Sequence, residues 1–256
     1  MASLILVLAP VSLSVAADKS DRPFHYEDDR LGEKQDESDK FKFARVKIAP
    51  MYPGAFLGDR GEMWSHDYPE AGLHLSKILS ELSKLPVVLD ENEYIFQFDD
   101  PNLMKYPFAY MCEVGVMQLT DAEIKGMREY CLRGGFLLVD DFRNRRGFNQ
   151  MANFQYYLKQ AFPEPEYQMK LLDVTHPIFN CFFSIKTLDV RTAYAEPGKP
   201  EFYGVEDKHG RLMMIINFNN DVSDWWQWST DPFQPIDDTN TAYKFGVNYV
   251  FYALTH

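Results

Sequence analysis

The chain has 256 residues, of which 46% are hydrophobic and 15% aromatic, so it is long enough to bury one sizeable core. Its formal net charge is −12 and its pI is near 4.9, whereas proteins that bind nucleic acid need clustered positive charge. We therefore expect no nucleic-acid partner. Cys112, Cys131 and Cys181 lie far apart without C-x-x-C spacing, which indicates neither a thiolate metal site nor a disulfide framework.

The N-terminal stretch LILVLAPVSLSVAA, Leu4 to Ala17, has the length and apolar character of a signal peptide. It is too short for a stable membrane anchor, and small residues precede a plausible cleavage site before Asp18. We therefore predict a signal peptide over residues 1–17 and a periplasmic or secreted protein. No Lys or Arg precedes the apolar run, which leaves open an uncleaved segment as the one contact with a membrane. The charged residues 18–40 are predicted to be a flexible linker.

From residue 41 onward, short apolar runs alternate with segments of helical periodicity. Four runs have the length and composition of strands, at 41–49, 86–89, 108–114 and 136–141. Three segments have one apolar face at helical spacing, at 68–84, 120–133 and 148–162. Thr120 and Glu123 form a capping box at the start of the second of these helices, and Gly134 marks its end.

The last part of the domain combines a hairpin with a helix. Residues 201–218 have two apolar runs around a turn at Lys208 to Arg211, and residues 241–256 have an apolar helical face. For residues 41–256 we therefore predict a single α/β domain. It has an open, mainly parallel sheet with helices on both faces, a late β-hairpin and a C-terminal helix. Ligands of such sheets bind outside the carboxyl ends of the strands.

Several motifs carry a resemblance to a known family: FKFARVKIAP, HDYPEAGLHL, YPFAYMCEVG, MREYCLRGGFLLVDDF, HPIFNCFF, FNNDVSDWWQW and GVNYVFYALTH. Together they resemble the bacterial domain-of-unknown-function family 4159 from Phe41 to His256. That family is similar in fold to the glutaminase-like superfamily of glutamine amidotransferases and some sugar-utilisation proteins. The resemblance implies a glutaminase-like, flavodoxin-like fold but no settled activity. Two departures from the family pattern are Val114-Gly115, in place of Pro-Gly, and Arg143, in place of an aromatic residue.

The resemblance also frames the chemistry of the strand at 136–141. In amidotransferases the corresponding strand ends in a nucleophilic Cys, whereas here it ends in Asp140 and Asp141. None of the three cysteines is at this position, and thioester chemistry needs an activated nucleophile there. We therefore expect no thioester chemistry.

Polar and aromatic residues gather after the predicted strands. The candidate ligand-binding residues are Glu113, Asp140, Asp141, Arg143, Asn219, Asp221, Asp224, Trp225 and His66. Asp140, Asp141 and Asp221 are candidate ligands of a divalent metal ion, because hard cations bind carboxylate oxygens. No other cofactor is indicated. The alternative for the two adjacent aspartates, which we favour, is that one caps the following helix and the other pairs with Arg143 or Arg145.

Other candidates also have a structural alternative. The segment NNDVSD, Asn219 to Asp224, resembles part of a calcium loop, but an Asx-rich turn is the favoured interpretation. Trp225, Trp226 and Trp228 fit either carbohydrate stacking or a wedge that closes the core. His66 either faces the cleft or forms a local hydrogen bond, and the local bond is favoured. His176 before Pro177 is typical of a helix start.

Two function classes fit these features. The first is an exported, non-catalytic binding or structural module that holds a carbohydrate or an envelope protein. The second is a metal-dependent hydrolase or transferase that acts on an envelope or carbohydrate substrate through clustered carboxylates. We expect the binding module, because nearby guanidinium groups already supply counter-charge to the aspartates.

Overall fold

The central sheet of the computed structural model is built from these strands: β1 (Ala44–Val46), β3 (Ile95–Phe96), β4 (Phe108–Cys112), β6 (Phe136–Phe142), β7 (Lys170–Leu171), β8 (Glu201–Glu206) and β9 (Leu212–Phe218). They run in the order β3-β1-β4-β6-β9-β8-β7. Neighbours from β3 to β9 are parallel, and β8 and β7 each pair antiparallel with the preceding strand of that order. A separate antiparallel pair joins β2 (Ala49–Pro50) to β5 (Met117–Gln118).

The structure describes residues 39–51, 62–90, 94–194 and 198–256. The predicted signal peptide and nearly all of the predicted linker lie outside these residues. Within the described part of the chain, no helix is both long and apolar enough to cross a membrane.

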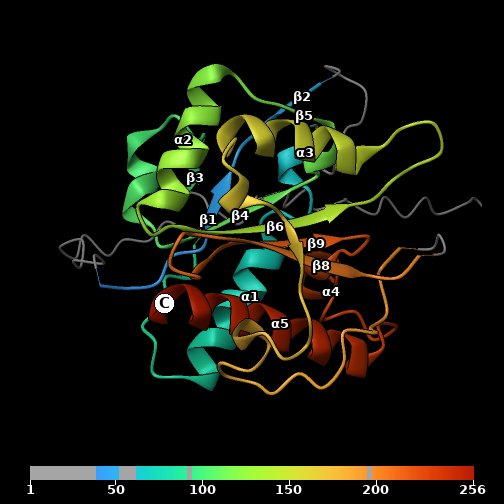
Figure 1. Cartoon of the computed structure of the whole chain (residues 1–256). Helices are drawn as coiled ribbons and strands as arrows, with labels where there is room; N and C mark the ends of the chain where they lie inside the picture. Colours follow the sequence, from blue (N-terminus) through green and yellow to red (C-terminus); the bar gives the residue numbers. More distant parts are fainter. Residues whose placement is uncertain (1–38, 52–61, 91–93, 195–197) are drawn as a thin grey trace, which may run out of the picture. The chain divides into compact units, whose positions relative to one another are not determined.

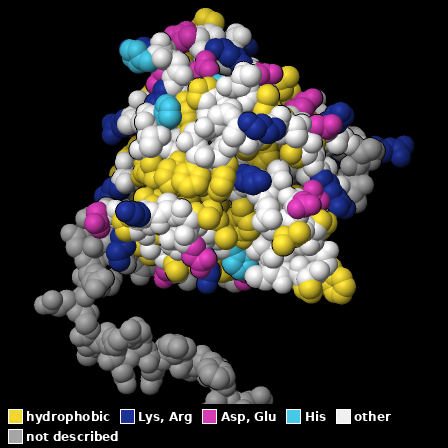
Figure 2. Space-filling model, turned by 90° about the horizontal axis from the view of Figure 1, so that it is seen from below, with side chains coloured by type: hydrophobic (Ala, Val, Ile, Leu, Met, Phe, Trp, Pro, Cys, Tyr) yellow, Lys and Arg dark blue, Asp and Glu magenta, His cyan; other side chains and the backbone are white. Residues whose placement is uncertain are grey.

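Helices cover both faces of the sheet (Figure 1). Their bounds are α1 (Glu70–Leu82), α2 (Asp121–Leu132), α3 (Gln150–Ala161), α4 (Val222–Gln227) and α5 (Ile236–Thr255). In Figure 1, α2 and α3 lie above the sheet, and α1, α4 and α5 lie below it. Figure 2 views the lower side and shows apolar side chains gathered in a patch, with charged side chains spread around it. The α/β class with a mostly parallel sheet, as predicted, is confirmed.

Strand β6 shows how the sequence separates the two cores. Side chains of a strand alternate between its faces, and both faces of this strand are covered. Leu137 and Val139 belong to the apolar cluster that contains α2 and α3 residues. Phe136 and Leu138 belong to the cluster that contains α1 and α5 residues. By the same alternation, the side chain of Asp140 lies on the face of Phe136 and Leu138. Its carboxylate is therefore on the side of the sheet that α4 and α5 cover.

The structure confirms the best-marked helix and the hairpin. Thr120 and Glu123 form both bonds of the capping box of α2, and Gly134 ends the segment with a φ of 108°. Strands β8 and β9 form the predicted antiparallel hairpin. His176 accepts a hydrogen bond from the Ile178 backbone N–H at the start of a short 3-10 helix, as expected from the following proline.

Several element predictions are wrong at the sheet edge and in short segments. The predicted strand 41–49 reduces to the three residues of β1, followed by β2 in the second sheet. Residues 86–89 contribute one isolated bridge, from Val87 to Phe41, and the edge position next to β1 is filled by β3 instead. Helix α5 begins at Ile236, five residues before the predicted 241. A two-residue strand buries too few side chains to leave a clear pattern in the sequence.

Candidate metal centre

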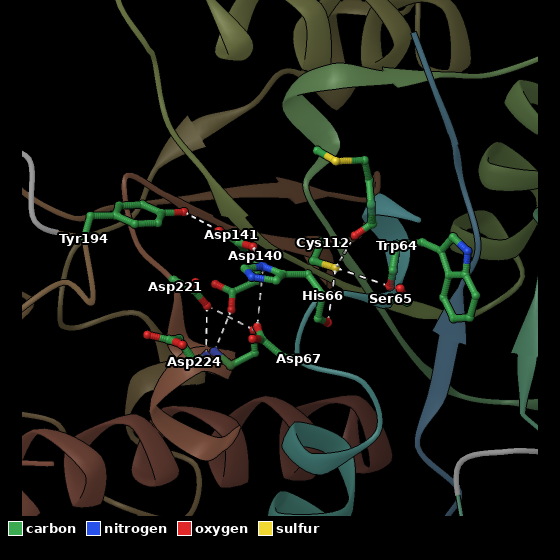
Figure 3. A network of polar contacts seen from close by, with 12 residues as sticks. Trp64, Ser65, His66, Asp67, Cys112, Asp140, Asp141, Tyr194, Asp221 and Asp224 are labelled. Carbon is green, nitrogen blue, oxygen red and sulfur yellow. Dashed lines mark hydrogen bonds and ion pairs between the residues drawn. The ribbon is translucent and has the colours of Figure 1, made fainter. Parts of the chain in front are cut away.

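Side chains from separate parts of the chain meet at the carboxyl ends of the parallel strands, as Figure 3 shows. Glu113 follows β4, Asp141 lies near the end of β6, and Asp221 comes shortly after β9. His66 and Asp67 come from the segment that leads into α1. This is the position at which open α/β sheets bind their ligands.

Among the residues that the structure describes, four other than glycine have a left-handed backbone, and three of these belong to this cluster. The φ angles are 59° for Asp67 and 53° for each of Glu113, Asp141 and Asn219. Such a backbone is uncommon outside glycine and costs energy that the surrounding structure must offset. At Asp141 it interrupts the regular alternation of β6, and the pairing with β9 shifts register between Val139 and Phe142. The shift is what turns the Asp141 side chain toward the loops.

Asp141 is held from two sides. Its Oδ2 atom is hydrogen-bonded to Nδ1 of His66, and its Oδ1 atom accepts a hydrogen bond of 2.7 Å from the Tyr194 hydroxyl. The Arg143 guanidinium stacks on the Tyr194 ring, with its central carbon 3.6 Å from the ring centroid. Arg143 therefore lies beside the carboxylate cluster, separated from Asp141 by one aromatic ring.

The geometry fits a metal ion. His66, Asp67, Asp141 and Asp221 each offer a ligand atom, and these atoms all lie within 4.8 Å of one another. Asp67 is completely buried, and its Oδ2 accepts a hydrogen bond of 2.6 Å from Ser223. Its Oδ1 has no hydrogen-bond partner within the described part of the chain. A buried oxygen without a partner is costly and rare in folded proteins. One imidazole nitrogen and three carboxylates are a donor set that transition metals accept.

Burial and mutual repulsion change the acidity of these groups. Burial raises the pKa of Asp67 to about 6, that of Asp140 to about 7 and that of Glu113 to about 8. Burial and the charge of Asp141 hold the pKa of Asp221 well above its usual value. Without a cation the cluster therefore reduces its negative charge by keeping protons.

Asp141 and His66 form the charged centre of the cluster. Burial alone opposes ionisation of Asp141, but hydrogen bonds from His66 and Tyr194 lower its pKa below the usual value. Burial likewise opposes the charge of His66, yet its hydrogen bond to Asp141 and the nearby carboxylates raise its pKa to about 10. A metal ion that binds here must therefore displace the His66 proton.

Asp140 has a different environment from its neighbour. Its Oδ2 accepts hydrogen bonds from the backbone N–H groups of Val222 and Ser223, at 2.9 and 3.0 Å. Its Oδ1 accepts a bond of 2.9 Å from Asn217, which itself accepts one from the Tyr249 hydroxyl. Asp140 therefore anchors the start of α4 to the sheet, which favours a supporting role over that of a metal ligand.

The other predicted site residues lie at different distances from the cluster. Asp221 caps α4 by accepting from the Asp224 backbone N–H at 2.9 Å, so the expected Asx turn opens a short helix. Asn219 donates to the Lys199 carbonyl at 3.0 Å. Trp225 is 6% exposed and Trp226 is fully buried, as expected of a wedge in the core. Two structural expectations for Asp140 and Asp141 are wrong within the described residues. Asn149, and neither aspartate, caps the following helix α3. The two carboxylates bond to the partners given above and form no ion pair with an arginine.

Three contributors to the site were absent from the sequence-based candidates. Asp67 is adjacent to His66 and lies just before a predicted helix, which is the signal that could have identified it. Ser223 bonds to Asp67 and, at 2.6 Å, to Tyr110 of β4. Tyr194 comes from a segment without regular structure, and no periodicity links it to Asp141.

The sequence model of a family described as Domain of unknown function (DUF4159) matches residues 42–254. Because this match covers most of the chain, the protein belongs to that family. No curated protein matches the chain.

Proposed function

We propose that the protein binds a divalent metal ion between His66, Asp67, Asp141 and Asp221 and acts as a metal-dependent hydrolase. The observation that carries this proposal is the convergence of ligand atoms from three separate segments within 4.8 Å of one another. A cation would neutralise carboxylates that otherwise have to take up protons, and it would give the buried Oδ1 of Asp67 a partner.

The donor set favours particular metals. Mg²⁺ and Ca²⁺ are bound mostly through oxygen, whereas imidazole nitrogen suits Zn²⁺ and other transition metals. A site with one imidazole and three carboxylates therefore fits Zn²⁺ or Mn²⁺ better than Ca²⁺ or Mg²⁺. In such a site the ion would supply Lewis-acid chemistry.

Two further groups are placed to take part in hydrolysis. In the metal-free protein, burial and the charge of Asp141 raise the pKa of Glu113 to about 8, which makes this carboxyl group the candidate proton donor to a leaving group. Arg143 holds a positive charge beside Asp141 through its stacking on Tyr194, which suits a polar or anionic substrate. Buried carboxylates of raised pKa thus support the hydrolase, because perturbed pKa values cluster at functional sites.

A non-catalytic binding module is the second candidate function, and the burial of the cluster favours it. The side chains of Asp67 and Asp141 are 0% and 3% exposed, and His66, at 27%, is the member of the ion pairs most open to solvent. A cation enclosed so deeply could organise a binding surface for a carbohydrate or an envelope protein without reacting. Metal binding is expected of both the hydrolase and the binding module. Turnover of a substrate is expected of the hydrolase alone.

We also propose that the protein is exported and adopts a glutaminase-like fold. The apolar stretch from Leu4 to Ala17 supports export. The parallel sheet with helices on both faces supports the fold proposal. N-terminal sequencing of the protein purified from the periplasm should begin at Asp18; recovery of the full-length chain from the cytoplasm would contradict export.

The metal site is tested by thermal unfolding with EDTA, and then with Zn²⁺, Mn²⁺, Ca²⁺ or Mg²⁺. A ligand that binds the native state raises the midpoint by mass action, so we expect Zn²⁺ or Mn²⁺ to raise it most. Asp221→Asn keeps an oxygen that can cap α4 but removes the charge, and should abolish the shift. Asp237→Asn, an exposed position in the first turn of α5, is the control and should respond like the wild type.

Hydrolysis is tested by screening the metal-loaded protein on aryl esters, aryl phosphates and aryl glycosides. Turnover that disappears in Asp221→Asn and persists in Asp237→Asn is the expected result. A midpoint that no metal moves would refute the metal centre. Metal binding without turnover on any substrate would leave the binding module as the better function.

A further inference from the structure

Arg45 is a charged residue in the middle of the core. It lies on β1 between Ala44 and Val46, which are both completely buried, and its own exposure is 0%. Removing a guanidinium from water is expensive unless its surroundings compensate for the lost hydration. An apolar side chain would continue the pattern of β1 without that cost. The charge at this position therefore points to a role outside the strand itself.

Arg45 contacts the segment that contains His66 and Asp67. Its Nη1 atom donates hydrogen bonds to the carbonyl oxygens of Trp64 and His66, at 3.2 and 2.9 Å. These carbonyls belong to the short 3-10 helix Met63–Ser65 and the residue after it. One guanidinium thus fixes the main chain on both sides of Ser65, immediately before the left-handed Asp67.

Aromatic rings hold the guanidinium in place. Its central carbon lies 4.7 Å from the ring centroid of Tyr110 and 5.5 Å from that of Tyr68. Such cation–π contacts strengthen when they are desolvated, as they are here. The Tyr110 hydroxyl also contacts Ser223, the residue that donates to Asp67. Arg45 and Tyr110 therefore support Asp67 from two directions.

We propose that Arg45 is a positioning residue of the metal centre. Through its hydrogen bonds to the main chain it fixes where His66 and Asp67 lie, and it does not bind the ion itself. This inference rests on the proposed function. The His66 carbonyl is tied to Arg45 while its imidazole is tied to Asp141, so the residue is fixed at both ends. Residues that orient metal ligands typically change metal affinity by about ten-fold or more when they are replaced.

The test compares Arg45→Met and Arg45→Lys with the wild type by calorimetric titration of the full chain with Zn²⁺ and Mn²⁺. Arg45→Met keeps an apolar, unbranched side chain in β1, and we expect its Kd to rise by about ten-fold or more. Arg45→Lys should recover part of the loss, because an ammonium can still donate to a carbonyl. A Kd for Arg45→Met equal to that of the wild type would overturn the proposal.

Arg211→Met is the matched control. Arg211 also donates to main-chain carbonyls, those of Cys131 and Gly134, but these lie at the far end of α2. Its replacement should lower the midpoint of unfolding and leave the Kd unchanged. If both variants weaken metal binding equally, Arg45 acts only through overall stability and the positioning role is wrong.

A second measurement separates the positioning role from the metal proposal. In the metal-free protein, NMR hydrogen exchange of the backbone N–H groups of His66 and Tyr68, which donate to the carbonyls of Met63 and Ser65, reports the order of this segment. Arg45→Met should raise both exchange rates relative to those of the remaining core, and Arg45→Lys should restore part of the protection. Unchanged exchange in Arg45→Met refutes the positioning role, even if the wild type binds no metal. If Arg45→Met does not fold, the same two measurements on Arg45→Lys decide, with a weaker Kd and faster exchange expected.

Discussion

At the scale of single residues, Glu113 and Asp141 illustrate how neighbouring carboxylates acquire different chemistry. Glu113 follows β4, Asp141 lies near the end of β6, and both have a left-handed backbone. Asp141 receives hydrogen bonds from His66 and Tyr194 and stays ionised, whereas burial and the charge of Asp141 raise the pKa of Glu113 to about 8. Paired carboxylates whose pKa values are driven apart are a recurring arrangement for a fixed anion and a proton donor.

This difference predicts the effect of Glu113→Gln on hydrolysis. The amide cannot donate the same proton, so we expect kcat to fall by about 10²-fold or more and the basic limb of the pH–rate profile to disappear. The metal affinity should stay within about three-fold of the wild type, since Glu113 is not among the four grouped ligands. A profile with an unchanged basic limb would remove Glu113 from the mechanism.

At the scale of elements, α4 depends on a carboxylate from the sheet. Asp140 accepts from the first two backbone N–H groups of this six-residue helix, and the end of β6 thereby fixes where Asp221 and Ser223 lie. Helices this short do not persist alone, because nucleation is unfavourable. The position of Asp221 in the metal centre therefore follows from Asp140.

We expect Asp140→Ala to lower the free energy of unfolding by about 3 kcal/mol, because it leaves buried N–H groups without an acceptor. It should also weaken metal binding. Thr120→Ala removes the cap of α2 and should cost about 1 kcal/mol with no change in metal affinity. Chemical denaturation and metal titration of both variants check this. Equal metal affinities in the two variants would contradict the role given to Asp140.

The elements also show how far the sequence alone could lead. The capping box predicted α2 because the signal is local, and the alternation of β6 places Asp140 on the α4 side. The left-handed turn at Asp141 follows from no local pattern, since His66 and Tyr194 lie far away along the chain. Helix α4 is too short for its periodicity to be recognised. The sequence therefore identified Asp141, Asp221 and His66 as candidates but could not show that Asp67 joins them.

At the scale of the whole molecule, the buried cluster makes stability depend on pH. The pKa values of Asp67, Asp140, Glu113 and His66 are raised above their ordinary values, to about 6, 7, 8 and 10. The folded protein therefore binds more protons than the unfolded chain between the ordinary and the raised values of each group, and its stability falls as pH rises through that window. The lowered pKa of Asp141 acts in the opposite direction, but only in more acidic solution.

We therefore expect the unfolding midpoint of the metal-free protein to fall between about pH 5 and pH 9, measured by scanning calorimetry in EDTA. Saturating Zn²⁺ or Mn²⁺ should flatten the dependence, because the ion replaces protons in the cluster. The net charge of −12 could give a similar trend through general repulsion. Asp221→Asn removes a carboxyl group of the cluster and Asp237→Asn an exposed carboxylate, so only a slope that is shallower in Asp221→Asn than in Asp237→Asn assigns the effect to the cluster. Equal slopes in the two variants, or a midpoint that rises with pH, would contradict this origin of the pH dependence.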